Sequence, residues 1–153
     1  MKTNLRILTL AGVLCVGLFT ANAAEKAEHD HAHMGGPKGG RLLDKTKPHA
    51  EFVVEKDRTV TIHFYNEAMQ PVAATTQTVT AIAEAKSGKS TLQFEKKGDS
   101  LVSKTKLPDG DGYNIVVQFR QTAEARPLNL RFKLDMHICG GCKRAEYGCT
   151  CDH

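Results

Sequence analysis

The segment Arg58-Thr-Val-Thr-Ile-His-Phe-Tyr65 alternates apolar and polar side chains along its whole length. Val60, Ile62 and Phe64 fall on one side of this alternation. A period of two residues predicts a β-strand with one buried face. Residues 49–55 alternate in the same way just before it, so the two segments together predict a hairpin.

The same alternation returns in later segments, and Pro108-Asp-Gly-Asp-Gly112 is a strong loop signal between two of them. The further predicted strands are residues 78–85, 91–95, 101–105, 113–119 and 128–134. No long stretch has a helical period. We therefore expect an all-β domain over residues 49–135, an antiparallel immunoglobulin-like sandwich of about seven strands. This domain has no Trp and no Cys, so it would be a sandwich by architecture only.

The N-terminus has the three parts of an export signal. Lys2 and Arg6 precede an apolar run, and Ala21-Asn22-Ala23 is a small-x-small cleavage site. We expect residues 1–23 to be a cleaved signal peptide, which predicts a periplasmic or secreted protein with no membrane span after cleavage. Cys15 would be discarded with the signal, because the bulky Leu14 before it fits a lipoprotein cleavage site poorly.

Charge and motifs narrow the classes of function. Cleavage would remove Lys2 and Arg6 but none of the 17 acidic residues, which leaves a net charge of +2. So weak a charge, without a basic stripe, gives no reason to expect a nucleic-acid partner. No nucleophile elbow, His-Glu-x-x-His or phosphate-binding glycine loop is present. We expect a binding protein rather than an enzyme.

The tail, residues 136–153, is the richest source of soft metal ligands in the chain. It combines a Cys-x2-Cys motif, a Cys-x-Cys motif, two histidines and a methionine. Thiolate, imidazole and thioether ligands favour zinc or copper. The candidate ligands in the tail are Met136, His137, Cys139, Cys142, Cys149, Cys151 and His153.

Two other interpretations of the tail stay open. In an oxidising compartment four cysteines can form two disulfides, and pairing between the two motifs would be less strained than a bridge within Cys149-Thr-Cys151. The chain would then be an exported partner-binding domain with a knotted tail. Thiol redox exchange through Cys139 and Cys142 is a weaker alternative, because Cys139 follows a predicted strand rather than opening a helix.

Residues 24–48 predict a flexible arm, because they are rich in Gly, Lys and His and poor in core-forming residues. Within it, His29, His31, His33 and Met34 form a second ligand cluster that we expect to capture metal ions weakly. The alternative is a solvated polar segment.

A third candidate lies on the first hairpin. His49 and Glu51 are two residues apart on a predicted strand and so share a face. If the strand register brings either opposite His63, they could form a surface metal site. The alternative is a set of ordinary solvent-facing polar side chains.

The stretch His31-Ala-His-Met-Gly-Gly-Pro-Lys-Gly-Gly-Arg-Leu-Leu43, followed by Pro48-His-Ala-Glu-Phe52, resembles the His-rich N-terminal region of periplasmic adaptor subunits of heavy-metal efflux pumps. The resemblance covers roughly residues 29–56 and implies periplasmic metal handling through His31, His33, His49 and Glu51. The chain lacks the long coiled hairpin and the length of such adaptors. The Cys-rich tail is not part of the resemblance.

Together these observations predict an exported protein that binds zinc or copper for buffering, transfer or resistance. Its expected partners are metal ions and a metal-efflux or other envelope protein.

Overall fold

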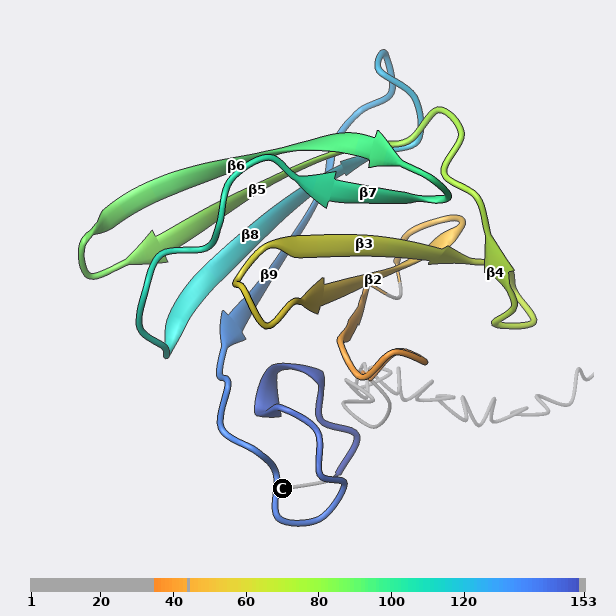
Figure 1. Cartoon of the computed structure of the whole chain (residues 1–153). Helices are drawn as coiled ribbons and strands as arrows, with labels where there is room; N and C mark the ends of the chain where they lie inside the picture. Colours follow the sequence, from red (N-terminus) through yellow and green to blue (C-terminus); the bar gives the residue numbers. More distant parts are fainter. Residues whose placement is uncertain (1–34, 44, 152–153) are drawn as a thin grey trace, which may run out of the picture.

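The computed structural model describes residues 35–43 and 45–151, and these residues form an antiparallel all-β fold (Figure 1). A short 3-10 helix, η1, lies near the C-terminal end (Glu146–Gly148). The strands are β1 (Arg41–Leu43), β2 (His49–Val54), β3 (Val60–Tyr65), β4 (Pro71–Val72), β5 (Thr78–Ala85), β6 (Gly88–Lys97), β7 (Ser100–Ser103), β8 (Tyr113–Arg120) and β9 (Leu128–Leu134). Within the described part of the chain, no helix is long and apolar enough to cross a bilayer.

The strands follow one hydrogen-bonded path, in the order β1-β2-β3-β7-β6-β5-β8-β9, with β4 paired to β3. The long strand β6 makes this continuity possible. Its first part pairs with β5 through Gly88–Gln93, and its last residues, Phe94–Lys97, pair with β7. The sheet therefore curves round and nearly closes into a barrel-like shape (Figure 1).

The antiparallel all-β class is confirmed, but the seven-strand sandwich is not. Each of the seven predicted segments forms a strand, and two short strands, β1 and β4, bring the count to nine in the described residues. These two strands have three and two residues, too few for a visible period. The expected split into two sheets fails because β6 joins both sets of strands.

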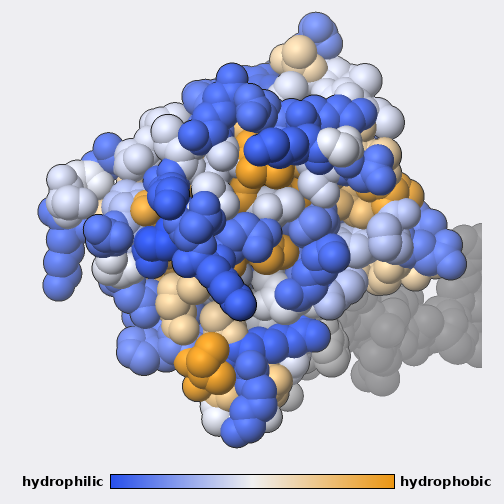
Figure 2. Space-filling model, in the orientation of Figure 1, coloured by the Kyte–Doolittle hydropathy of each residue, from blue (hydrophilic) through white to orange (hydrophobic). Residues whose placement is uncertain are grey.

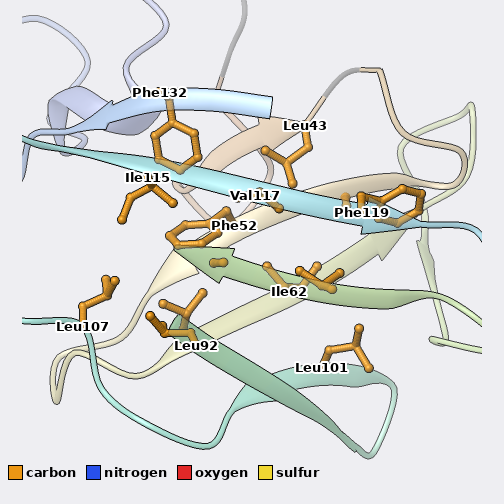
Figure 3. Close-up of a cluster of buried hydrophobic side chains, with 14 of the residues drawn as sticks. Leu43, Phe52, Ile62, Leu92, Leu101, Leu107, Ile115, Val117, Phe119 and Phe132 are labelled. Atoms are coloured by element: carbon orange, nitrogen blue, oxygen red, sulfur yellow. The ribbon is translucent and has the colours of Figure 1, made fainter. Parts of the chain in front are cut away.

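The core lies inside the curve of the sheet (Figure 3). In β8 every second residue is buried, which places Tyr113, Ile115, Val117 and Phe119 on the inner face. The Phe52 ring meets the Phe132 ring edge-on at 5.3 Å between centroids, and this contact joins β2 to β9. Hydrophilic side chains cover most of the face seen in Figure 2. Most of the core comes from the apolar alternation that is visible in the sequence, and Leu43, Leu107 and Tyr147 add to it from outside those segments.

Residues 35–43 and 45–48, expected to belong to the flexible arm, are part of the folded domain. Strand β1 pairs with β2 in the register Arg41↔Phe52 to Leu43↔Ala50. The loop of residues 36–40 closes through hydrogen bonds between Gly36 and Gly40 (N to O, 2.8 Å) and between Gly39 and Gly36 (3.1 Å). The glycine content suggested a flexible arm, but these glycines allow the backbone to come close to neighbouring groups, as the site shows.

Candidate metal centre

The tail leaves β9 and folds back on itself to form a compact loop below the sheet (Figure 1). An isolated β-bridge joins Ile138 to Ala145. Between them, the Cys139 amide donates to the Arg144 carbonyl (2.8 Å), and the Lys143 amide donates to the Cys139 carbonyl (3.1 Å). Lys143 has a left-handed backbone, with φ of 61°. These bonds hold the Cys-x2-Cys motif in a tight turn.

The glycines of this turn do not adopt its left-handed backbone conformation. Their role is to leave space for a neighbouring side chain. The positive φ of the turn falls on Lys143. A Cβ placed on Gly141 would lie 2.9 Å from the Cys151 sulfur. Gly141 is therefore needed because the second cysteine motif packs directly against the turn.

The four cysteines of the tail converge on one point. The sulfurs of Cys139, Cys142, Cys149 and Cys151 all lie within 4.8 Å of one another. The distance is 3.5 Å between the Cys142 and Cys149 sulfurs and 3.8 Å between those of Cys139 and Cys151. Each close pair takes one sulfur from each motif, so the two motifs form a single cluster that could hold a metal ion.

The thiols of the cluster differ in pKa. Hydrogen bonds from the backbone amides of Thr150 and Arg144 to the Cys142 sulfur lower the pKa of Cys142 to about 6, because they stabilise the thiolate. The Cys151 amide donates to the Cys149 sulfur (3.3 Å), which also favours the thiolate. Burial and hydrogen bonds with the neighbouring cysteines outweigh this and raise the pKa of Cys149 to about 12. A first thiolate is therefore available near neutral pH, whereas Cys149 and Cys151, whose pKa values are raised, would lose their protons more readily beside a cation.

Tyr147 anchors the tail to the domain. Its side chain is buried in the core, where its ring stacks on Phe132 at 6.4 Å. The Val54 amide donates to the Tyr147 hydroxyl (3.0 Å), and the Tyr147 amide donates to the Asp135 carbonyl (2.9 Å). This apolar anchor joins the tail to the domain without involving the cysteines.

Glu51 lies in a buried site lined by hydrogen-bond donors, and the prediction that it lies on the surface is wrong. It is fully buried on the face of β2 covered by the 36–40 loop. Its carboxylate accepts hydrogen bonds from the Lys38 and Gly40 amides (2.9 and 2.8 Å) and from the Tyr65 hydroxyl (2.6 Å). A Cβ on Gly36 would lie 2.2 Å from this carboxyl carbon, so only glycine fits there. The hydrogen bonds of Glu51 fix the 36–40 loop against β2.

The predicted register between the hairpin residues is present, but it does not gather a surface site. Glu51 lies directly opposite His63, and His49 lies opposite Tyr65. The His63 ring contacts the Ser100 hydroxyl (3.0 Å), and burial lowers the pKa of His63. His49 keeps its Nδ1 buried without a hydrogen-bond partner among the described residues.

His137 points to acidic neighbours. Its Nδ1 lies 2.8 Å from Asp135 and 3.3 Å from Asp111, and the hydrogen bond with Asp135 raises the pKa of His137. These three residues form a group separate from the cysteines. Met136 packs partly buried against the core. The remaining predicted ligands, His29, His31, His33, Met34 and His153, lie outside the described residues.

Asp111 is a neighbour of the tail that sequence reasoning missed. Its carboxylate accepts a hydrogen bond from the Met136 amide (3.0 Å), across 25 positions of the chain. The only sequence signal is the Pro-Asp-Gly-Asp-Gly loop, which predicts a turn but not what it meets.

Comparison with known proteins gives no relative: no family model, no curated protein and no solved structure matches this chain.

Proposed function

We propose that this protein is an exported transition-metal binding protein that holds zinc or copper through the thiolates of Cys139, Cys142, Cys149 and Cys151. It would act in metal buffering, transfer or resistance, without catalysing a reaction. The observation that carries the proposal is the convergence of four sulfurs, drawn from two motifs, within 4.8 Å.

The spacing of the sulfurs supports a tetrahedral ion. Four sulfurs placed about 2.3 Å from a central zinc are separated from one another by roughly 3.8 Å. The close pairs in this cluster are 3.5 and 3.8 Å apart, whereas bonded sulfurs of a disulfide lie about 2.0 Å apart. Copper(I) also suits an all-thiolate site, so the ligand set leaves both metals open.

The proposal of export rests on the N-terminal sequence. Export would give the bound metal a second role, which is to protect the thiols. In an oxidising compartment, coordination would keep the four thiols from being oxidised. The resemblance to metal-efflux adaptors also supports an envelope location, and it makes a metal-efflux or other envelope protein a partner to test.

The direct test is metal content combined with a thiol count on the mature, tag-free protein purified from the periplasm. We expect about one zinc or copper ion per chain and four reactive thiols after denaturation with a chelator. A protein with neither metal nor reactive thiols would instead have a disulfide-bonded tail. The partner-binding alternative would then take precedence.

Two observations bear on the two alternatives, disulfide pairing and thiol exchange. The paired approach of Cys142 to Cys149 and of Cys139 to Cys151 would let two disulfides form between the motifs after a small movement. The lowered pKa of Cys142, caused by the amides of Thr150 and Arg144, would suit thiol exchange. Exchange with a small-molecule disulfide that disappears when Cys139 and Cys142 are replaced by Ser, in a protein that retains no metal, would favour the redox alternative.

A further inference from the structure

We propose that Asp111, Asp135 and His137 form a second metal site, which binds a divalent transition-metal ion without any help from the cysteines. Each of the three side chains offers one ligand atom, and these three atoms lie within 4.8 Å of one another. Asp111 belongs to the loop before β8, whereas the other two residues follow the end of β9. The site therefore lies where the tail leaves the sheet.

The spacing of the ligand atoms resembles the spacing around one ion. The Nδ1 atom of His137 lies 2.8 Å from an oxygen of Asp135 and 3.3 Å from an oxygen of Asp111. Two ligand atoms about 2.1 Å from a zinc ion, at angles between a right angle and a tetrahedral one, are roughly 3.0–3.4 Å apart. A small shift of the imidazole would let all three groups bind the same ion.

Backbone amides hold both carboxylates in place. The Met136 amide donates to the two oxygens of Asp111 (3.0 Å each), and the Gly112 amide donates to one of them (2.8 Å). The His137 amide donates to the Asp135 carboxylate (3.1 Å). Hydrogen bonds of this kind orient the carboxylate ligands of metal sites. The two acids are thus positioned without relying on the imidazole ring.

Charge and exposure at this site favour a cation that enters from solvent. The side chains of Asp111 and Asp135 are 29% and 30% exposed, and the ring of His137 is 82% exposed. Glu146 adds negative charge near the ring, and Lys133 offsets part of the charge of Asp135. Because the carboxylates are partly shielded from water, a divalent cation would interact with them more strongly than at a fully exposed site.

The ligand set selects the class of ion. Imidazole nitrogen suits zinc, nickel and copper(II), and the two carboxylate oxygens add a preference for divalent ions over copper(I), which favours sulfur. Three protein ligands leave a position for water, as in open zinc sites. The ion would therefore exchange more readily than one enclosed by four thiolates.

The test is a cobalt(II) titration of the reduced mature protein after one equivalent of zinc has been added, followed by calorimetry and visible absorption. His29, His31 and His33 are replaced by Ala throughout, so these histidines cannot bind the added ion. We expect one equivalent of cobalt to bind without thiolate-to-metal absorption. Asp111→Asn and His137→Ala should each weaken this binding by roughly tenfold or more.

The matched control is Asp109→Asn, which removes a fully exposed acid of the same loop and should bind cobalt normally. Asp111→Asn keeps an acceptor for the Met136 amide, and His137→Ala leaves the Asp111 hydrogen bonds intact, so the two variants disturb the fold differently. Unchanged binding in both variants, or no second equivalent in the parent protein, would overturn the inference. Cobalt binding that requires Asp111 and His137, in a protein whose cysteines retain no zinc, would support this site and contradict the proposed function.

Discussion

Different interactions stabilise the β domain and the tail. The domain buries an apolar side chain at every second position of strands such as β8, and its largest buried groups include Phe52, Ile62 and Ile115. Within residues 136–151 only Cys139, Tyr147 and Gly148 are buried. Hydrophobic burial can therefore hold the domain together alone, while the tail depends on one aromatic anchor, its backbone hydrogen bonds and whatever joins its four sulfurs.

The comparison shows where a ligand can change this molecule. An ion at the cysteines would add its binding free energy to a region with little core of its own. The same ion would add little to the order of a domain whose strands already pack around a shared core. Metal should thus govern the tail and leave the sheet nearly unchanged.

The largest effect should come from replacing Cys142 by Ser. Loss of one of four converging thiolates should weaken zinc binding by roughly a hundredfold or more, since even the loss of an outer partner of a ligand costs 10- to 100-fold. The far-ultraviolet circular dichroism of the domain should stay unchanged. Competition with a zinc-binding dye measures the affinity. Ser90, a half-buried residue of β6, offers a control as Ser90→Ala, which should bind normally.

Tyr147→Ala should remove the aromatic contact that anchors the tail to the β domain. It removes a buried ring that stacks on Phe132, and such truncations cost about 3 kcal/mol of unfolding free energy. Tyr147→Phe keeps the ring but removes the acceptor of the Val54 amide, at a cost of about 1 kcal/mol. Urea denaturation of both variants measures the difference. Equal costs would mean that the hydroxyl, not the ring, anchors the tail.

Glu51→Gln should destabilise the loop that lies between the two regions. The amide side chain has one acceptor oxygen where the carboxylate has two, and Glu51 now serves two backbone amides and the Tyr65 hydroxyl. We expect a loss of about 2 kcal/mol, the scale of hydrogen bonds to a buried charged group. The control is Glu95→Gln on the exposed face of β6, which should change stability by less than about 0.5 kcal/mol. A match between the two variants would contradict the role given to Glu51.

The smallest effect should be a pH dependence confined to one thiol. In the reduced, metal-free protein, Cys142 should react with iodoacetamide at half its maximal rate near pH 6, because its pKa is lowered to about 6 and only the thiolate reacts. Reactivity should rise above this pH and disappear below it. Mass spectrometry of the labelled peptides identifies the site. Labelling of all four cysteines with a common midpoint near pH 8.5 would contradict the unequal environments in the cluster.

The sequence predicted the strands well, for a clear reason. Alternation in segments such as 58–65 and 113–119 reports burial on one face, and this is what a strand in a curved sheet requires. It could not report the shape of the sheet, because closure depends on β6 pairing with different neighbours at its two ends.

The candidate site divides in the same way. The spacing of the cysteines predicted that both motifs could join in one cluster, and the structure brings all four sulfurs together. The burial of Glu51 could not be predicted, since the period of β2 places it on the face away from the core. That face is covered because the 36–40 loop folds over it and the Tyr65 hydroxyl contacts Glu51 from the neighbouring strand, and a period of two residues reports neither contact. His137 likewise lies apart from the cysteines, where it contacts Asp135 and also Asp111, which belongs to another loop.

X-ray absorption spectroscopy of the zinc-loaded protein carrying Ala at His29, His31 and His33 tests the central claim most directly. With these three histidines replaced, a shell of four sulfurs at the zinc–thiolate distance identifies the tail cysteines as the ligands. The account predicts four sulfur neighbours at about 2.3 Å from zinc. A first shell made mainly of nitrogen and oxygen, or a protein that retains no zinc, would contradict it.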